Sequence, residues 1–109
     1  MRARAVVGAG ICGFTTTVAA TSDDMQNVSF EIETDCETIR KLAAELPDVD
    51  GYMEIGDGFD GSIYEAVRST MKGCCAGCAV PCAIFKAMQV AAGLALPASV
   101  SIDIQKDEV

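Results

Sequence analysis

Residues 27–47, NVSFEIETDCETIRKLAAELP, decide the fold of this chain. Polar and apolar residues alternate over the first seven positions, which places Val28, Phe30 and Ile32 on one face of a half-buried strand. Apolar residues then recur every three or four positions until the final proline, and this spacing predicts a helix with one apolar face. A strand that leads directly into a helix is typical of a mixed α and β domain.

The predicted helix covers residues 34–46 and begins with a capping box, because Glu37 follows Thr34 at the spacing that this motif requires. With Thr34 as the N-cap, Cys36 lies in the first turn of the helix. Unpaired backbone N–H groups and the positive end of the helix dipole favour negative charge at that point. The position therefore suits a cysteine that binds a metal as a thiolate.

Two further strands are predicted before this unit, at residues 2–8 and 14–20, because both segments are rich in β-branched residues. The glycine-rich sequence GAGICG joins them, so Cys12 lies in a loop at the end of a strand. Two arginines and a mildly apolar run also give residues 1–20 a superficial likeness to a secretory signal. Glycines and threonines dilute the apolar run, and we therefore expect the segment to be part of the fold.

Two more helices are predicted after the first. Ser62 and Glu65 form a second capping box, which opens a helix over residues 63–72. Pro81 is typical of the first position of a helix, and the apolar spacing that follows it continues until Gly93.

The end of the chain predicts a last strand, with Val100, Ile102 and Ile104 on one side, followed by a solvated acidic tail. Residues 47–61 mix turn formers with apolar residues and predict an irregular loop or a short extended piece. We therefore expect residues 1–109 to form a single α+β domain. Its mostly antiparallel sheet has about four strands, with about three helices packed on it.

Composition restricts the class of protein and its partners. Half of the residues are apolar and 22% are charged, which is the balance of a soluble globular protein. The net charge of −8 and the pI of 4.2 oppose contact with nucleic acid or an anionic membrane. A basic or redox protein, or a small ligand, is therefore the expected partner. No stretch approaches the roughly 20 continuous apolar residues that a membrane span requires.

Residues 72–82, KGCCAGCAVPC, hold four of the six cysteines, and the chain contains no histidine. A complete set of three disulfides is disfavoured, because Cys74 and Cys75 are adjacent and only Cys12 and Cys36 lie outside this segment. Reduced thiols that bind metal or act in catalysis are the expected alternative in the cytoplasm.

The spacing C-x2-C from Cys75 to Cys78 lets two sulfurs reach one metal ion or neighbouring irons. With Cys82 added, the run partly resembles the end of a bacterial ferredoxin motif, although Pro81 precedes the last cysteine instead of following it. A structural zinc site commonly uses two such pairs, and this chain has one, so an iron–sulfur cluster of the 4Fe–4S type is expected before zinc. The predicted ligands are Cys12, Cys36, Cys75 and Cys78, with Cys82 as the substitute.

Three functions stay open on these residues. The first is an iron–sulfur protein for electron transfer, cluster delivery or redox sensing, and the second is a zinc-binding structural or interaction module. The third is a thiol redox enzyme, although a thioredoxin-like C-x2-C should follow a strand, whereas this one follows a predicted helix. Each cysteine can also be a small buried hydrophobe, and this interpretation suits Cys74 best.

Three segments carry a resemblance to a known family: AGICGF, IETDCETIRKLA and CAVPCAIFKAMQVAAGLALPASVSIDI. Over nearly its whole length the chain resembles a family of small, functionally uncharacterised domains found mainly in anaerobic bacteria and archaea. The resemblance implies that cysteines at positions 12, 36 and 78 recur and that position 75 can carry histidine, as a ligand position would. Cys74 and Cys82 are less typical of the family. The resemblance also implies the cytoplasm of an anaerobe and names no activity.

Overall fold

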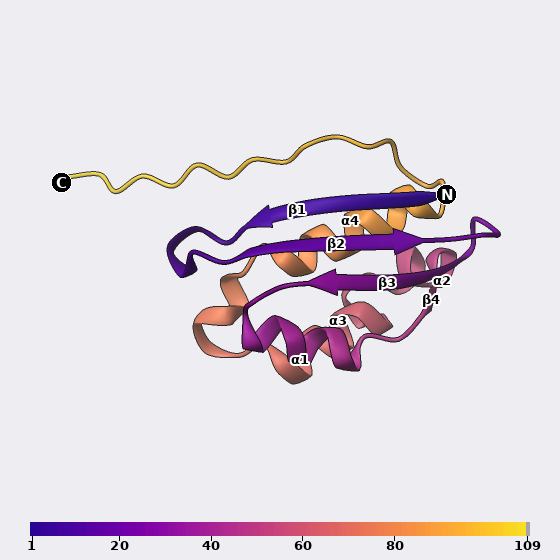
Figure 1. The fold of residues 1–109 in the computed structure, drawn as a ribbon, viewed down its shortest axis with the longest axis horizontal. Helices are drawn as coiled ribbons and strands as arrows, with labels where there is room; N and C mark the ends of the chain where they lie inside the picture. Colours follow the sequence, from indigo (N-terminus) through magenta and orange to yellow (C-terminus); the bar gives the residue numbers. More distant parts are fainter. Residues whose placement is uncertain (109) are drawn as a thin grey trace.

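The computed structural model of the protein describes residues 1–108, and four antiparallel strands form its sheet in the order β1-β2-β3-β4 (Figure 1). The strands are β1 (Arg2–Gly8), β2 (Thr15–Thr21), β3 (Asn27–Glu33) and β4 (Val49–Asp50). The helices are α1 (Glu37–Glu45), α2 (Gly51–Asp57), α3 (Ser62–Thr70) and α4 (Val80–Ala91), with short 3-10 helices η1 (Gly10–Cys12), η2 (Gly58–Asp60) and η3 (Gly73–Gly77). The predicted α+β class is confirmed.

The helices lie on one face of the sheet (Figure 1). α4 packs on β1 and β2, while α1 packs on β3 and on α3. Alternate residues of β3 point into this helical layer, as the sequence predicted: Val28 is buried and Phe30 and Ile32 are half-buried. The residues between them are exposed on the opposite face, which carries Arg2 and Arg4 on β1 and acidic side chains on β3.

The core lies between the sheet and the helices. Ile39 and Leu42 of α1 supply the apolar face that the sequence predicted, and Ile84 and Met88 do the same for α4. Burying a side chain of this size contributes roughly 1.5–3 kcal/mol. The largest fully buried apolar side chains are Ile39, Leu42, Ile63, Ile84, Met88, Val18, Val28 and Val80.

The second capping box does not form as predicted. Gly61 is the N-cap of α3, and the carboxylate of Glu54, in α2, accepts the backbone N–H groups of Ser62 at 2.8 Å and Ile63 at 3.3 Å. Glu54 is only 3% exposed. A buried carboxylate that is distant in the sequence therefore replaces the local Ser62–Glu65 pair, and it joins α2 to α3.

Residues 47–61 are more regular than predicted, because they contain β4 and the helix α2. The side chain of Asp50 caps α2 by accepting the backbone N–H groups of Tyr52 and Met53. Gly51 packs so closely on α4 that a Cβ atom there would lie 2.9 Å from Cβ of Ala92. A close tertiary contact thus fixes the start of α2. The predicted short extended piece is present as β4, but the helix that follows it was not predicted.

The predicted last strand is also wrong. Residues 96–108 have no regular secondary structure, and Val100, Ile102 and Ile104 are 59%, 72% and 87% exposed. The fourth strand of the sheet is β4 instead. An alternating segment becomes a strand only when a neighbouring edge satisfies its backbone, and within residues 1–108 no backbone hydrogen bond involves a residue after Leu94. In Figure 1 this segment runs along β1 and projects past the rest of the molecule.

One segment, Gly73–Ala91, is long and apolar enough to cross a membrane when judged by length and composition alone. The sequence prediction had not identified such a stretch. In the structure the segment is not one continuous helix, because Cys78 and Ala79 separate η3 from α4. α4 is the core helix of the domain, with six of its residues buried: Val80, Pro81, Ile84, Ala87, Met88 and Ala91.

Candidate functional site

Five of the six cysteines line one cavity of about 180 Å³ at one end of the domain. They come from three separate segments of the chain: the β1–β2 loop, the start of α1, and η3 with the residue after it. All are free thiols. We call this space the thiol cavity, and its cysteines are Cys12, Cys36, Cys74, Cys75 and Cys78.

The rest of the cavity wall is mostly apolar. Ile39, Met71 and Val80 are buried and form its inner side, while Ile11 and Phe14 of the β1–β2 loop are exposed at its outer side. The other residues that line the cavity are Ala9, Thr16, Thr38 and Gly77. Sulfur is therefore the most abundant donor atom among the side chains of this wall, and its apolar surroundings weaken competition from water.

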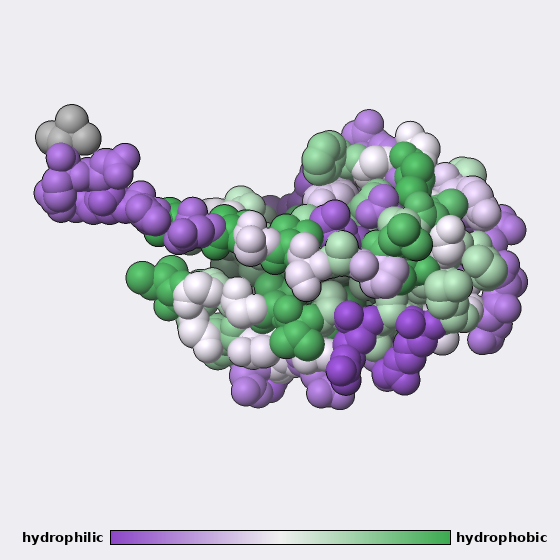
Figure 2. All heavy atoms as spheres, turned by 90° about the horizontal axis from the view of Figure 1, so that it is seen from above, coloured by the Kyte–Doolittle hydropathy of each residue, from purple (hydrophilic) through white to green (hydrophobic). Residues whose placement is uncertain are grey.

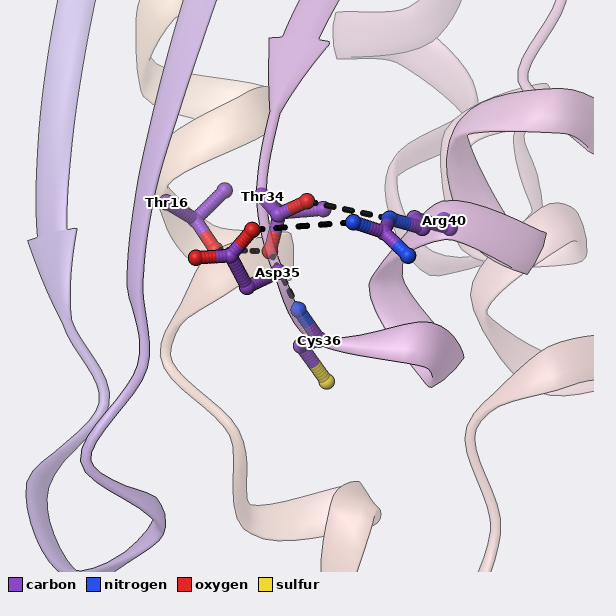
Figure 3. A network of polar contacts seen from close by, with 5 residues as sticks. All are labelled: Thr16, Thr34, Asp35, Cys36 and Arg40. Atoms are coloured by element: carbon purple, nitrogen blue, oxygen red, sulfur yellow. Dashed lines mark hydrogen bonds and ion pairs between the residues drawn. The ribbon is translucent and has the colours of Figure 1, made fainter.

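A network of threonines holds Cys36 at the start of α1 (Figure 3). The Cys36 backbone N–H donates to Thr34 Oγ1 at 3.1 Å, and Thr34 Oγ1 lies 2.8 Å from Thr16 Oγ1 on β2. Arg40 Nε donates to the Thr34 carbonyl at 3.1 Å and also pairs with Asp35. The Cys36 sulfur points away from this network (Figure 3).

The same network shifts the start of α1 from its predicted position. The N-cap is Cys36 itself and the helix begins at Glu37, so the capping box of Thr34 and Glu37 is not formed. The reason is that the Thr34 hydroxyl turns toward Thr16 and the Cys36 N–H instead of reaching further into the helix. Cys36 still lies at the amino-terminal end of α1, one residue before its first turn.

Cys75 and Cys78 are half-buried, and each is tied to a helix that borders the thiol cavity. Cys75 Sγ donates to Thr38 Oγ1 in the first turn of α1 at 3.9 Å. The backbone N–H of Val80, the first residue of α4, donates to Cys78 Sγ at 3.5 Å. The amino-terminal ends of α1 and α4 therefore meet at the C-x2-C pair, as the sequence suggested.

Cys12 is the outermost of the predicted ligands. It is exposed and is the last residue of the 3-10 turn η1, which begins at Gly10 (φ +73°) and is followed by Gly13 (φ +76°). Residues other than glycine rarely adopt such φ angles, so these two glycines make the tight loop possible. The backbone hydrogen bond from Ala9 N to Phe14 O, 3.0 Å long, closes the loop below it.

The structure separates Cys74 and Cys82 in a way that differs from the prediction, which gave Cys82 as the substitute ligand and Cys74 as a small buried hydrophobe. Cys74 lines the thiol cavity, because the 3-10 turn of η3 directs it there together with Cys75. Cys82 lies in the first turn of α4 as predicted, but it is exposed and is not among the described residues that line the cavity. It lies instead near Tyr64, where burial raises the pKa of the tyrosine hydroxyl and the Cys82 sulfur adds to that rise.

The thiols share a cavity without forming a ready-made cation site. Among residues 1–108, no group of three or more cysteine, aspartate and glutamate side chains is arranged to hold a metal ion. Cys12 and Cys74 are exposed, and their segments contain glycines, so rotation of these side chains toward the cavity requires no change in the core. The donor set suits a soft metal that prefers thiolate ligands.

Comparison with known proteins identifies a family. A family model described as "Family of unknown function (DUF6951)" matches residues 3–104. No curated protein and no solved structure matches the chain. The match spans the three segments that form the thiol cavity.

Proposed function

The chain belongs to this family of unknown function, and we propose that this protein binds an iron–sulfur cluster, or another thiolate-bound metal, in the thiol cavity. One observation carries the proposal: five free thiols from three separate segments line a single, mostly apolar cavity. Cysteines used only as small hydrophobes have no reason to gather at one opening, and three of these are only half-buried while two are exposed.

The proposed ligands are Cys36, Cys75 and Cys78 on the inner side, with Cys12 as the fourth. Cys74 replaces Cys82 as the alternative ligand, because it lines the same cavity. When bound, the cluster supplies a one-electron redox centre.

The protein groups around the proposed ligands orient the sulfurs and limit the access of water. The Val80 N–H group donates to the Cys78 sulfur, and hydrogen bonds of this kind to metal-bound sulfur tune a redox centre. Thr38 holds the Cys75 sulfur against α1 in the free protein. Ile39 and Met71 close the inner side of the cavity with apolar surface.

We place a cluster before a single zinc ion because a structural zinc site commonly uses two C-x2-C pairs, and this chain has one. A cluster keeps its attachment points several ångströms apart, and so it suits ligands from three segments. A structural or interaction module built on zinc is the alternative.

The biological role that we propose is electron transfer, cluster delivery or redox sensing in the cytoplasm. The net charge of −8 favours a basic or redox protein as the partner over nucleic acid or a membrane. These roles share the requirement that the cluster lies near the surface, and exposed Cys12 and Ile11 form the outer side of the cavity.

Anaerobic reconstitution tests the proposal. Protein incubated with ferrous iron and sulfide should turn brown, with broad absorbance near about 400 nm and about four irons and four sulfides per chain. Cys36→Ser, Cys75→Ser and Cys78→Ser should each lose most of the bound iron, whereas Cys82→Ser is the matched control and should keep it. Parallel Cys12→Ser and Cys74→Ser variants identify the fourth ligand.

Colourless protein without iron after reconstitution would overturn the iron–sulfur assignment. Stoichiometric zinc bound by the same thiols would support the structural module instead.

A thiol redox enzyme is the second candidate, because the free C-x2-C pair lies shortly before α4, and the backbone N–H of the first residue of that helix donates to Cys78. It predicts that one cysteine reacts with iodoacetamide at unusually low pH and that Cys75 and Cys78 form a reversible disulfide. An even rate of alkylation over all six thiols would count against it.

A further inference from the structure

β1 is an edge strand with one open side. In the described chain it pairs with β2 over its whole length, from Arg2 opposite Thr21 to Gly8 opposite Thr15, and it has no partner on its other side. Backbone N–H and C=O groups along such an edge can accept another strand. An edge of seven residues is normally covered, charged or paired.

Residues 99–105, SVSIDIQ, have the pattern of a strand and lack a partner. Val100, Ile102 and Ile104 alternate with polar residues and are largely exposed. Within residues 1–108 their backbone forms no hydrogen bond with another backbone group. Seven residues of extended chain span about 23 Å, which equals the span of the seven residues of β1.

The two segments are complementary in polarity and charge. On β1, Ala3, Ala5 and Val7 face the helical layer, while Arg2 and Arg4 lie on the opposite face. If residues 99–105 add as a strand with their three apolar side chains toward the helices, Asp103 lies on the same face as the two arginines. Neighbouring strands place opposite charges close enough to attract each other.

We propose that residues 99–105 of one copy pair with β1 of a second copy, and that the reciprocal contact closes a two-fold symmetric dimer. The tail of the same chain runs along β1 without bonding to it and continues past the end of the strand (Figure 1). Its hydrophilic end projects clear of the body of the molecule, where a neighbour can receive it (Figure 2). Two-fold symmetry covers both open edges with one contact made twice.

Charge exchange between two variants tests this dimer. In reducing buffer, light scattering coupled to size exclusion should give the wild-type chain twice its 11.4 kDa mass. Arg2→Asp with Arg4→Asp in one variant, and Asp103→Arg in the other, should each dimerise at least about tenfold more weakly, since like charges then face each other. An equimolar mixture of the two variants should regain the dimer mass, because both contacts of the mixed pair join opposite charges.

The matched control is Met53→Asp, which adds a negative charge at an exposed apolar residue of α2 and should leave the dimer unchanged. Val100→Asp with Ile102→Asp should give a folded monomer with an unchanged circular dichroism spectrum. The proposal is overturned by a monomeric wild-type chain at every concentration, which includes the case of a tail that folds back on its own β1. It is equally overturned by a dimer that survives the Val100 and Ile102 substitutions, or by a mixture that stays monomeric.

Discussion

Replacing Thr34 with valine removes one hydroxyl and leaves the volume of the side chain nearly unchanged. That hydroxyl accepts the Cys36 N–H at 3.1 Å and lies 2.8 Å from the hydroxyl of Thr16, which is only 1% exposed. A buried hydroxyl left without a partner costs about 1–3 kcal/mol, and a lost N–H partner at a helix start costs about 0.5–2 kcal/mol. The two losses overlap, so we expect Thr34→Val to lower the free energy of unfolding by about 2 kcal/mol.

For a chain of this length, that loss lowers the melting temperature by about 8 °C. Urea denaturation and thermal unfolding of the reduced, metal-free protein measure both quantities. Thr34→Ser is the matched control, because it keeps the hydroxyl and removes only a methyl group. It should therefore stay within about 1 kcal/mol of the wild type.

The double variant Thr16→Val with Thr34→Val provides a sharper test. Removing both hydroxyls leaves neither one buried and unpaired, so the double variant should be about 1 kcal/mol more stable than Thr34→Val alone. Equal stability of Thr34→Val and Thr34→Ser would refute the reasoning. Strictly additive losses in the double variant would show that the two hydroxyls do not depend on each other.

Three further predictions concern the scaffold. Glu54→Ala removes the buried acceptor of the first α3 N–H groups and should lower the free energy of unfolding by about 3 kcal/mol in urea denaturation. The stability of Glu54→Gln should lie between that of Glu54→Ala and that of the wild type. Gly51→Ala should cost about 1–3 kcal/mol, because its new Cβ would lie 2.9 Å from Cβ of Ala92; Gly56→Ala, where nothing lies within 4 Å of a new Cβ, is the control. Hydrogen bonds from Asn27 and its neighbours lower the pKa of Asp24 from 3.8 to about 2. Ionised Asp24 therefore stabilises the fold above about pH 4, and this contribution to the free energy of unfolding disappears as the pH falls toward 2. Asp24→Asn should remove this pH-dependent contribution in an acid titration followed by circular dichroism.

Local patterns predicted the elements that depend on local forces. The strand of residues 27–33 appears where alternation placed it, and the helix follows it with a start later than predicted. Gly93, with a φ of +73°, follows α4 as predicted. The missed elements depend on distant contacts instead. α2 is a short helix with two glycines, and its start depends on the packing of Gly51 against α4.

The gathering of the cysteines could be predicted only in part, because it too depends on distant contacts. Cysteines at the starts of helices and in a glycine-rich loop suggested a common cavity, and the β1–β2 hairpin and α1 do bring Cys12 and Cys36 to the segment of Cys75 and Cys78. The exchange of Cys74 for Cys82 depends on the 3-10 turn of η3, which the spacing of the cysteines does not reveal. The ligand role of these residues stays a prediction.

The thiol cavity joins three stretches of chain that are far apart in the sequence. A bound group that bridges them stabilises the folded state as a cross-link does, because unfolding must then either break the bridge or keep long loops closed in the unfolded chain. An occupant that binds only the folded protein raises the melting temperature with its concentration, whatever its chemical nature. Resistance to heat therefore offers a way to search for the natural occupant without assuming its identity beforehand.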